Sequence, residues 1–434
     1  MFLEPLSLPL DSPAARRIIP QGKAIALSIL LAMAGSGCAR TTATSQRATA
    51  ANALGTTARA RDNDPTDAPA PAATAPLVSA PVGSAIGDGG AGAMQRRLSV
   101  PRVNPWKSAT RDGHQIDTDH FTLRTTIRNG DLRRFLPNFS ERALTQYTTA
   151  IVPLPAPSRK LESFIFGTRD EWVKFTQDRL GEDAGAYLGL GRGGYTSKSV
   201  AILYDIGPTD TLTILAHEGW HQYSQAVFQQ ELPVWLEEGV ATFMEGYRVD
   251  SEGQPLFAAW RNFERFGELR DAVRREELIP LAELLDGTPQ QFLADGRDRL
   301  LTYYAQVWAL THFFAEGANG KYRAALAELL TDAVTGQISQ TLEERMSTNA
   351  DRRTVQRLMS RGGIRGLPGT LVARGYFSEN FAEFAAEYDA FVRQICGRGS
   401  GEFIWRGVSP IPRVLAEPMP AHDANEQDAE QNDP

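Results

Sequence analysis

The stretch Ile214–Gln225 reads ILAHEGWHQYSQ and leads, after a short connection, into Leu232–Glu245, which reads LPVWLEEGVATFME. The first stretch carries an H-E-x-x-H pattern that begins at His217 and ends at His221. On a helix, residues four apart lie on the same face, so both imidazoles can converge on one cation. Glu218 lies about 100° around the helix from His217, where a carboxylate can act as a general base without being a metal ligand. The pattern therefore predicts two zinc ligands and a base on one helix.

The third ligand of a tetrahedral catalytic zinc has to come from another part of the chain. Glu237 and Glu238 lie on the next predicted helix, which Pro233 can begin because its missing N–H costs nothing in the first turn. The connection before Pro233 is long enough for this helix to return antiparallel beside the first. Helical spacing alone does not decide between the two glutamates.

The segment Trp235–Gly239, WLEEG, together with the histidine pattern before it, resembles the gluzincin metallopeptidases, especially the peptidase-MA-like domains of bacterial secreted proteins. In that family the glutamate directly before the glycine binds the metal. The resemblance therefore implies Glu238 as the third zinc ligand beside His217 and His221. It also implies Glu218 as the general base.

Two residues of these helices bear on how closely the site follows that family. Thermolysin-like gluzincins have an aspartate four residues after the glutamate ligand that orients a ligand histidine, and this chain has Thr242 there. A hydroxyl can still bond an imidazole N–H, although a carboxylate does so more strongly. Gly219 inside a helix costs about 1 kcal/mol relative to alanine, which indicates that another group approaches this helix closely.

The N-terminal residues 1–37 are predicted to be a secretory signal peptide. Basic residues come first, the apolar segment Ala24–Ala34 follows, and small residues precede Cys38. The apolar segment is shorter than the roughly 20 residues that span a bilayer. The small residues before Cys38 resemble a bacterial lipobox, which implies export and a lipid anchor on that cysteine. Ordinary cleavage after Ala39 is the alternative.

Composition divides the rest of the chain. Residues 38–105 are rich in Ala, Thr, Pro and Gly, and residues 414–434 are strongly polar, so neither segment buries enough apolar surface to offset the entropy of ordering. We expect a disordered tether and a disordered tail there. A sheet lobe is predicted at 106–206 and a helical zinc-site lobe at 207–413. The predicted fold class is α+β, with a small mixed or antiparallel sheet followed by a mainly helical, gluzincin-like lobe.

Within the sheet lobe, apolar alternation predicts strands at 119–126 and 161–166, with a helix from Leu132 to Ile151 between them. In gluzincins an edge strand beside the cleft pairs with an extended peptide substrate. The resemblance implies this role for Gly194–Leu203, and an ordinary core strand is the alternative.

After Glu245 the chain is predicted to be almost wholly helical, beginning with a helix at Leu256–Arg275. The later stretch Leu300–Glu316, LLTYYAQVWALTHFFAE, resembles the family's tyrosine helix, in which a tyrosine hydroxyl stabilises the oxyanion formed on the substrate. Tyr304 is the better match to that tyrosine, and Tyr303 is the neighbour that can replace it.

Charge and cysteine content limit the expected partners. The net charge is −7 and no run of Lys or Arg occurs outside the signal region, which argues against nucleic-acid binding. The chain has two cysteines, too few for a disulfide framework. We expect a monomer whose partners are a peptide or protein substrate and a membrane contacted only through the lipid anchor.

These features predict a zinc-dependent metallopeptidase that hydrolyses peptide bonds outside the cytoplasm. One alternative is a peptidase-like envelope lipoprotein that binds zinc or a peptide without hydrolysis. The intact Glu218 argues against this alternative, because a protein that only binds needs no base. Another alternative is a structural envelope lipoprotein whose tether and folded part matter more than any site.

Overall fold

The computed structural model describes residues 99–188 and 193–412. Several predicted features lie outside these ranges, namely the signal peptide at 1–37, the anchor cysteine Cys38, the tether up to residue 98 and the tail at 414–434. Within the described ranges, no helix combines the length and the apolar composition that a membrane crossing requires.

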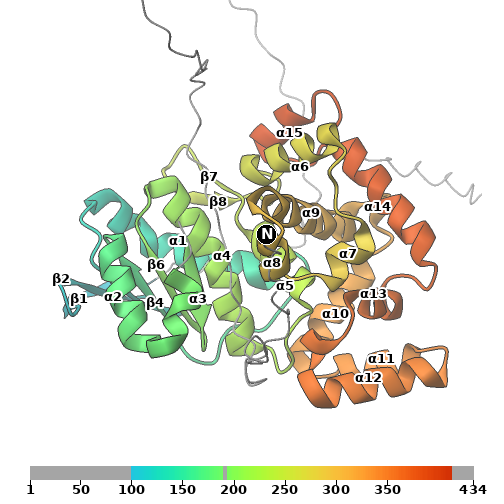
Figure 1. Ribbon diagram of the computed structural model, residues 1–434. Coiled ribbons are helices and arrows are strands. Elements are labelled where there is room, and N and C mark those ends of the chain that lie inside the picture. The colour runs from blue at the N-terminus through green and yellow to red at the C-terminus, as the bar shows by residue number, and fades with distance from the viewer. Residues whose placement is uncertain (1–98, 189–192, 413–434) are drawn as a thin grey trace, which may run out of the picture. The chain divides into compact units, whose positions relative to one another are not determined.

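The sheet lobe contains a six-stranded mixed sheet with the strand order β1-β2-β3-β4-β6-β5 (Figure 1). Strands β3, β4 and β6 run parallel to one another, and the remaining neighbours pair antiparallel. The strands are β1 (Arg102–Lys107), β2 (Asp112–Asp117), β3 (Phe121–Thr125), β4 (Leu161–Phe166), β5 (Gly194–Ser197) and β6 (Val200–Tyr204). The sheet therefore begins before the predicted start of the lobe, and the mixed α+β class is confirmed.

Strand β3 illustrates how the sequence forms this sheet. Phe121, Leu123 and Thr125 are buried, whereas the residues between them are partly exposed, as expected for side chains that alternate between two faces. Helix α1 (Gly130–Thr149) follows, and the side chain of Asn129 caps its first turn by accepting two backbone N–H groups. Helices α2 (Arg169–Leu180) and α3 (Gly185–Leu188) lie between β4 and β5.

The segment Gly194–Leu203, expected to act as an edge strand, is a hairpin rather than one strand. Its turn residues Lys198 and Ser199 both have positive φ, the conformation that a tight two-residue hairpin requires. Strand β5 is the terminal strand of the sheet, whereas β6 is paired on both sides. Only β5 therefore lies at this edge, and its four residues are buried.

The helical lobe begins with α4 (Pro208–Val227) and α5 (Val234–Met244), which carry the two motifs. Pro208 lies in the first turn of α4, whereas Pro233 is the N-cap residue directly before α5 rather than part of its first turn. The α-helices that follow, up to residue 412, are α6 (Phe263–Arg275), α7 (Leu281–Asp286), α8 (Pro289–Ala294), α9 (Arg297–Glu316), α10 (Arg323–Thr335), α11 (Ile338–Arg345), α12 (Asn349–Gly362), α13 (Gly369–Tyr376), α14 (Phe381–Ile395) and α15 (Ser400–Arg406).

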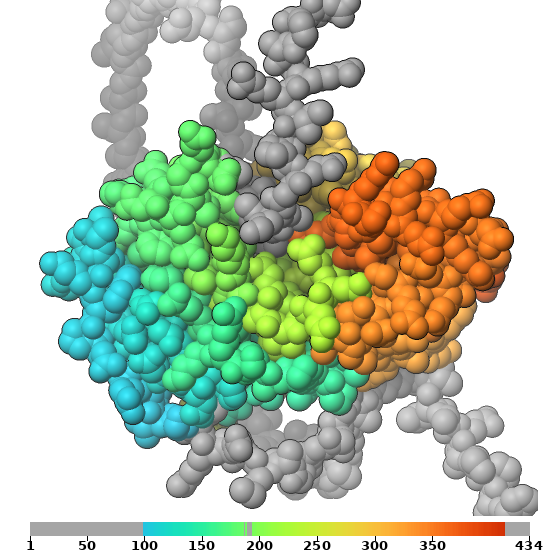
Figure 2. Space-filling model, turned by 90° about the horizontal axis from the view of Figure 1, so that it is seen from below, coloured from blue at the N-terminus to red at the C-terminus, as the bar shows by residue number. Residues whose placement is uncertain are grey.

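Two glycines allow the motif helices to pack closely against their neighbours. A Cβ on Gly219 would collide with the hydroxyl of Tyr147 on α1, which donates to the carbonyl of Ala216 at 2.7 Å. A Cβ on Gly239 would lie 2.6 Å from Thr311 Oγ1 on α9. Figure 2 shows one face of the molecule, on which the yellow-green motif region lies between the blue and green sheet lobe and the orange C-terminal helices. The close approach predicted from Gly219 is confirmed.

The helix expected at Leu256–Arg275 is wrong in its first part. Strands β7 (Tyr247–Val249) and β8 (Pro255–Phe257) form an antiparallel hairpin there. Asp250 Oδ1 accepts backbone N–H groups from the turn of this hairpin, which stabilises the reversal. The helix α6 starts only after Asn262, whose side chain caps it. Local side-chain bonds to the backbone thus outweigh the helical spacing of the apolar residues.

Candidate metal centre

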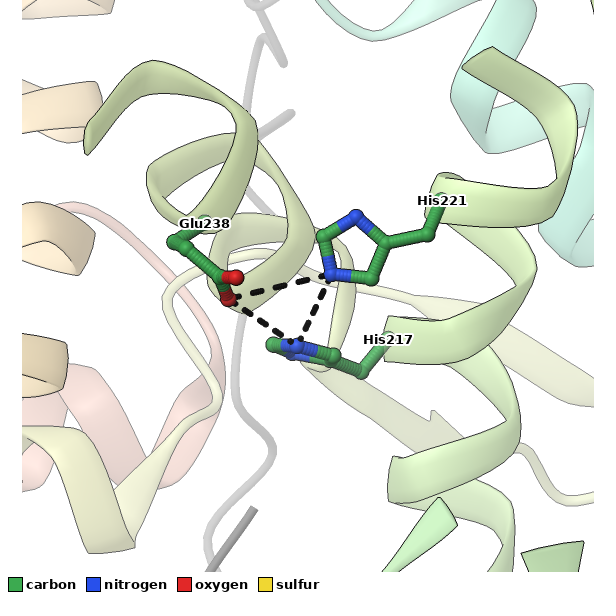
Figure 3. A group of neighbouring side chains, drawn as sticks. All are labelled: His217, His221 and Glu238. Carbon is green, nitrogen blue, oxygen red and sulfur yellow. Dashed lines mark hydrogen bonds and ion pairs between the residues drawn. The ribbon is translucent and has the colours of Figure 1, made fainter. Parts of the chain in front are cut away.

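The two histidines of the H-E-x-x-H pattern project from one face of α4. Their Nε2 atoms are 3.3 Å apart, and both side chains are fully buried. Figure 3 shows His217 and His221 reaching from one helix toward Glu238, which comes from a second helix. The helical spacing therefore places the imidazoles together as the sequence predicts.

Glu238 completes this group from α5. Its Oε2 lies 3.5 Å from His217 Nε2 and 3.7 Å from His221 Nε2. Donor atoms about 2.0–2.1 Å from a tetrahedral zinc are separated by roughly 3.4 Å, so the spacing of these three atoms suits one such ion. Glu238 Oε2 is also buried without a hydrogen-bond partner among the described residues. Because an unsatisfied buried carboxylate oxygen is costly, the group fits a metal ion that would satisfy it.

The charges of this group also favour a cation. Burial by itself would favour the neutral form of Glu238, but His217 and His221 lower its pKa to about 2. Burial likewise opposes protonation of His221, yet Glu237 and Glu238 outweigh it and raise the pKa of His221 to about 10. Positive charge is thus stabilised between the imidazoles and the carboxylates, whether a proton or a metal ion supplies it.

The structure distinguishes the two glutamates that helical spacing left open. Glu237 Oε1 lies 2.7 Å from His221 Nδ1, the ring nitrogen outside the donor group, and accepts a hydrogen bond from Ser224 Oγ at 2.6 Å. Glu237 therefore orients His221. Glu238 instead places its oxygen beside the Nε2 atoms, in the position that the resemblance implies for the ligand.

A second orienting carboxylate, Glu245, was not anticipated from the sequence. Its Oε1 lies 2.8 Å from His217 Nδ1, and Arg265 donates to the same oxygen at 3.0 Å. Burial opposes ionisation of Glu245, but Arg265 and His217 hold its pKa below the usual range. Glu245 follows Glu238 by two helical turns, which is the spacing that could have identified it. Thr242, where the family has its aspartate, donates only to carbonyls of its own helix.

A residue of the sheet lobe holds the side chain of Glu218. Thr196 of β5 donates from Oγ1 to Glu218 Oε2 at 2.8 Å. The other oxygen, Oε1, is buried and has no hydrogen-bond partner among the described residues. Burial raises the pKa of Glu218 above its usual value, and the imidazoles of His217 and His221 oppose this only in part. A carboxylate with a raised pKa and one unpartnered oxygen is suited to accepting and returning a proton.

Of the two candidate tyrosines of α9, Tyr304 lies beside His217. The ring of Tyr304 lies 6.3 Å from that of His217, with the guanidinium of Arg265 5.2 Å from its centre. The hydroxyl of Tyr303 is buried and has no partner among the described residues. Burial raises the pKa of Tyr303, and the charge of Glu238 adds to this effect. The structure therefore places the ring of Tyr304 beside His217, whereas the ring of Tyr303 stacks on Phe292.

The other described histidines lie in different surroundings. His120 pairs with Glu141 in the sheet lobe, its Nδ1 2.8 Å from the carboxylate. His312 is stacked on Trp260, with the ring centres 3.7 Å apart, and is fully buried. Neither these two residues nor His114 of β2 belongs to the group formed by the two motif histidines and Glu238.

Comparison with protein families gives a match over part of the chain. The family model described as "Protein of unknown function (DUF1570)" matches residues 211–334, which include most of α4 and extend into α10. The match contains the H-E-x-x-H pattern, all of α5 and the tyrosines of α9, whereas Thr196 lies outside it. Comparisons with curated proteins and with solved structures gave no match.

Proposed function

We propose that this chain is a zinc-dependent metallopeptidase of the gluzincin type. The observation that supports this most directly is the convergence of His217, His221 and Glu238 on one point beside the unpartnered Oε1 of Glu218. Two imidazoles and one carboxylate are a donor set of catalytic zinc sites, which retain an open position for water or substrate.

In this proposal His217, His221 and Glu238 hold the ion. Bound zinc would supply Lewis acidity, which polarises a substrate carbonyl and lowers the pKa of a water molecule. Glu218 accepts a proton from the attacking water at Oε1 and returns it to the leaving amine, while Thr196 keeps Oε2 in place. Tyr304 or Tyr303 donates a hydrogen bond to the oxyanion that forms on the substrate carbonyl.

The proposed substrate is a peptide bound in extended form. Strand β5 ends the sheet and carries Thr196, so this edge of the sheet lies next to the residue that positions Glu218. An extended peptide can add to such an edge through backbone hydrogen bonds. This arrangement would align a peptide bond with the metal centre without requiring a particular side chain.

The test combines metal analysis with cleavage of a peptide library. We expect one zinc per chain, loss of cleavage after chelation and recovery when zinc is returned. Glu218→Gln keeps the shape of the side chain but not its basicity, so it should retain zinc and lower turnover by about 10² to 10⁴. Full cleavage activity in Glu218→Gln, or a wild-type protein without bound zinc, would require this function to be abandoned.

We also propose that the protein is exported and anchored through a lipid on Cys38. The order of basic, apolar and small residues before this cysteine supports the proposal. Wild-type protein labelled with a radioactive fatty acid should carry the label and partition with membranes, and Cys38→Ser should not. Equal labelling of the two proteins would contradict the anchor.

A further inference from the structure

We infer that Glu245, fixed by Arg265 and Asn262, is the positioning residue that holds His217 in the orientation needed for metal binding. The inference rests on the proposed zinc function, because it concerns a histidine ligand of that site. It assigns to α6 a role in a centre whose candidate ligands come from α4 and α5.

The carboxylate of Glu245 is saturated by four donor contacts. Its Oε1 lies 2.8 Å from His217 Nδ1 and 3.0 Å from an Arg265 terminal nitrogen. Its Oε2 accepts from Asn262 Nδ2 at 2.7 Å and from Arg265 Nε at 3.2 Å. The guanidinium of Arg265 therefore binds both oxygens of Glu245, and this bidentate contact prevents the carboxylate from rotating away from the imidazole.

This contact also sets the tautomer of His217. An ionised carboxylate accepts hydrogen bonds but cannot donate one, so the proton between the two groups belongs to Nδ1. The lone pair then lies on Nε2, the nitrogen 3.5 Å from Glu238 Oε2. Glu245 thus leaves His217 in the form that binds a metal through Nε2.

The same contacts argue against a purely stabilising role for this ion pair. Both side chains are almost completely buried, with exposures of 1% for Arg265 and 2% for Glu245. Removing two charges from water is costly, and apolar residues of similar volume often stabilise a fold equally well or better. Because this pair contacts Nδ1 of His217, its burial is instead explained by the orientation that it imposes on the imidazole.

The residues that hold the carboxylate of Glu245 come from the start of helix α6, outside the two motif helices. Asn262 is its N-cap and accepts from the backbone N–H of Arg265 at 3.2 Å, while its amide donates to Glu245. One residue therefore joins the start of α6 to the carboxylate. Thr242 does not provide an alternative, because its hydroxyl bonds to the carbonyls of Glu238 and Gly239.

The experiment measures zinc affinity by competition with a chromophoric chelator, together with thermal unfolding of the metal-free protein. Glu245→Gln should weaken zinc binding by about 10-fold to 100-fold, as loss of such a supporting carboxylate typically does. Because it leaves Arg265 without its charge partner, this variant should also unfold at a lower temperature. The double variant Glu245→Gln with Arg265→Met removes both charges, so it should recover stability while retaining the loss in zinc affinity.

Glu141→Gln is the matched control, since Glu141 makes the same contact at 2.8 Å with His120 in the sheet lobe. It should leave zinc affinity unchanged, as should Thr242→Val. The visible absorption bands of the cobalt-substituted Glu245→Gln protein should shift, because the His217 ligand is reoriented.

The possible results separate the inference from the function on which it rests. Wild-type protein without stoichiometric zinc would overturn both. Wild-type zinc binding combined with unchanged affinity in the double variant would overturn the role of Glu245 alone. An affinity loss in Thr242→Val as large as that in Glu245→Gln would likewise overturn it.

Discussion

Thr196 donates a hydrogen bond to Glu218, with Oγ1 of the threonine 2.8 Å from Oε2 of the glutamate. The same hydroxyl lies 3.0 Å from the backbone carbonyl oxygen of Glu218. The terminal strand of the sheet thereby fixes the proposed base of a helix in the other lobe.

Replacing Thr196 with valine should test this link. The variant keeps the shape of the side chain but removes the donor, and a hydrogen bond to a charged group contributes about 1.5–3 kcal/mol. If the hydrogen bond stabilises the transition state by this amount, its loss should lower turnover by about tenfold to 100-fold. Zinc content should not change, because Thr196 is not a ligand. Thr196→Ser keeps the hydroxyl and should retain most of the activity.

The two neighbouring glutamates should differ in their effect on zinc. Glu238→Ala removes a donor atom, so we expect the purified protein to lose stoichiometric zinc. Glu237→Ala keeps all three ligand side chains but removes the carboxylate that orients His221. Zinc should therefore still bind, about 10-fold to 100-fold more weakly. Titration with zinc in the presence of a chelator distinguishes these outcomes. The reverse result would exchange the roles of the two residues.

Phenylalanine substitutions should separate the roles of the α9 tyrosines. We expect Tyr304→Phe to lower turnover by about 10², the effect of losing one oxyanion donor, with unchanged zinc affinity. Tyr303→Phe should have a smaller effect on turnover. Steady-state rates and zinc titrations on both variants provide the measurement. A large loss in Tyr303→Phe with none in Tyr304→Phe would move the oxyanion role by one residue.

His312 should make the fold sensitive to mild acid. Burial lowers the pKa of His312 below the usual value of 6.5, and Glu316 opposes this only in part. The unfolded chain therefore binds this proton more readily, so the contribution of His312 to stability is present above pH 6.5 and is lost as the pH falls through its folded-state pKa. His312→Phe keeps the packing against Trp260 and should flatten this dependence. Melting temperatures of the zinc-loaded proteins between pH 5 and 8 provide the measurement.

The local part of the candidate site could be predicted from residue spacing. Residues four apart on a helix share a face whatever surrounds them, so His217 and His221 could be paired from their spacing. Strand β4 at Leu161–Phe166 was likewise confirmed, because a short apolar run bounded by turns is already specified locally. The α+β class followed from the same patterns. The helix expected across Leu256–Arg275 was wrong in part because a turn and a cap outweighed apolar spacing.

The groups that surround the two histidines could not be predicted in the same way, because they depend on how the elements pack. Glu237 and Glu238 are neighbours in sequence, and packing of α5 against α4 determines which carboxylate meets Nε2 and which meets Nδ1. Thr196 and Arg265 come from β5 and α6, on either side of the motif along the chain. Periodicity reports which face of an element is buried but not which other element covers that face. The partners that orient His217 and Glu218 are therefore set by packing between distant segments.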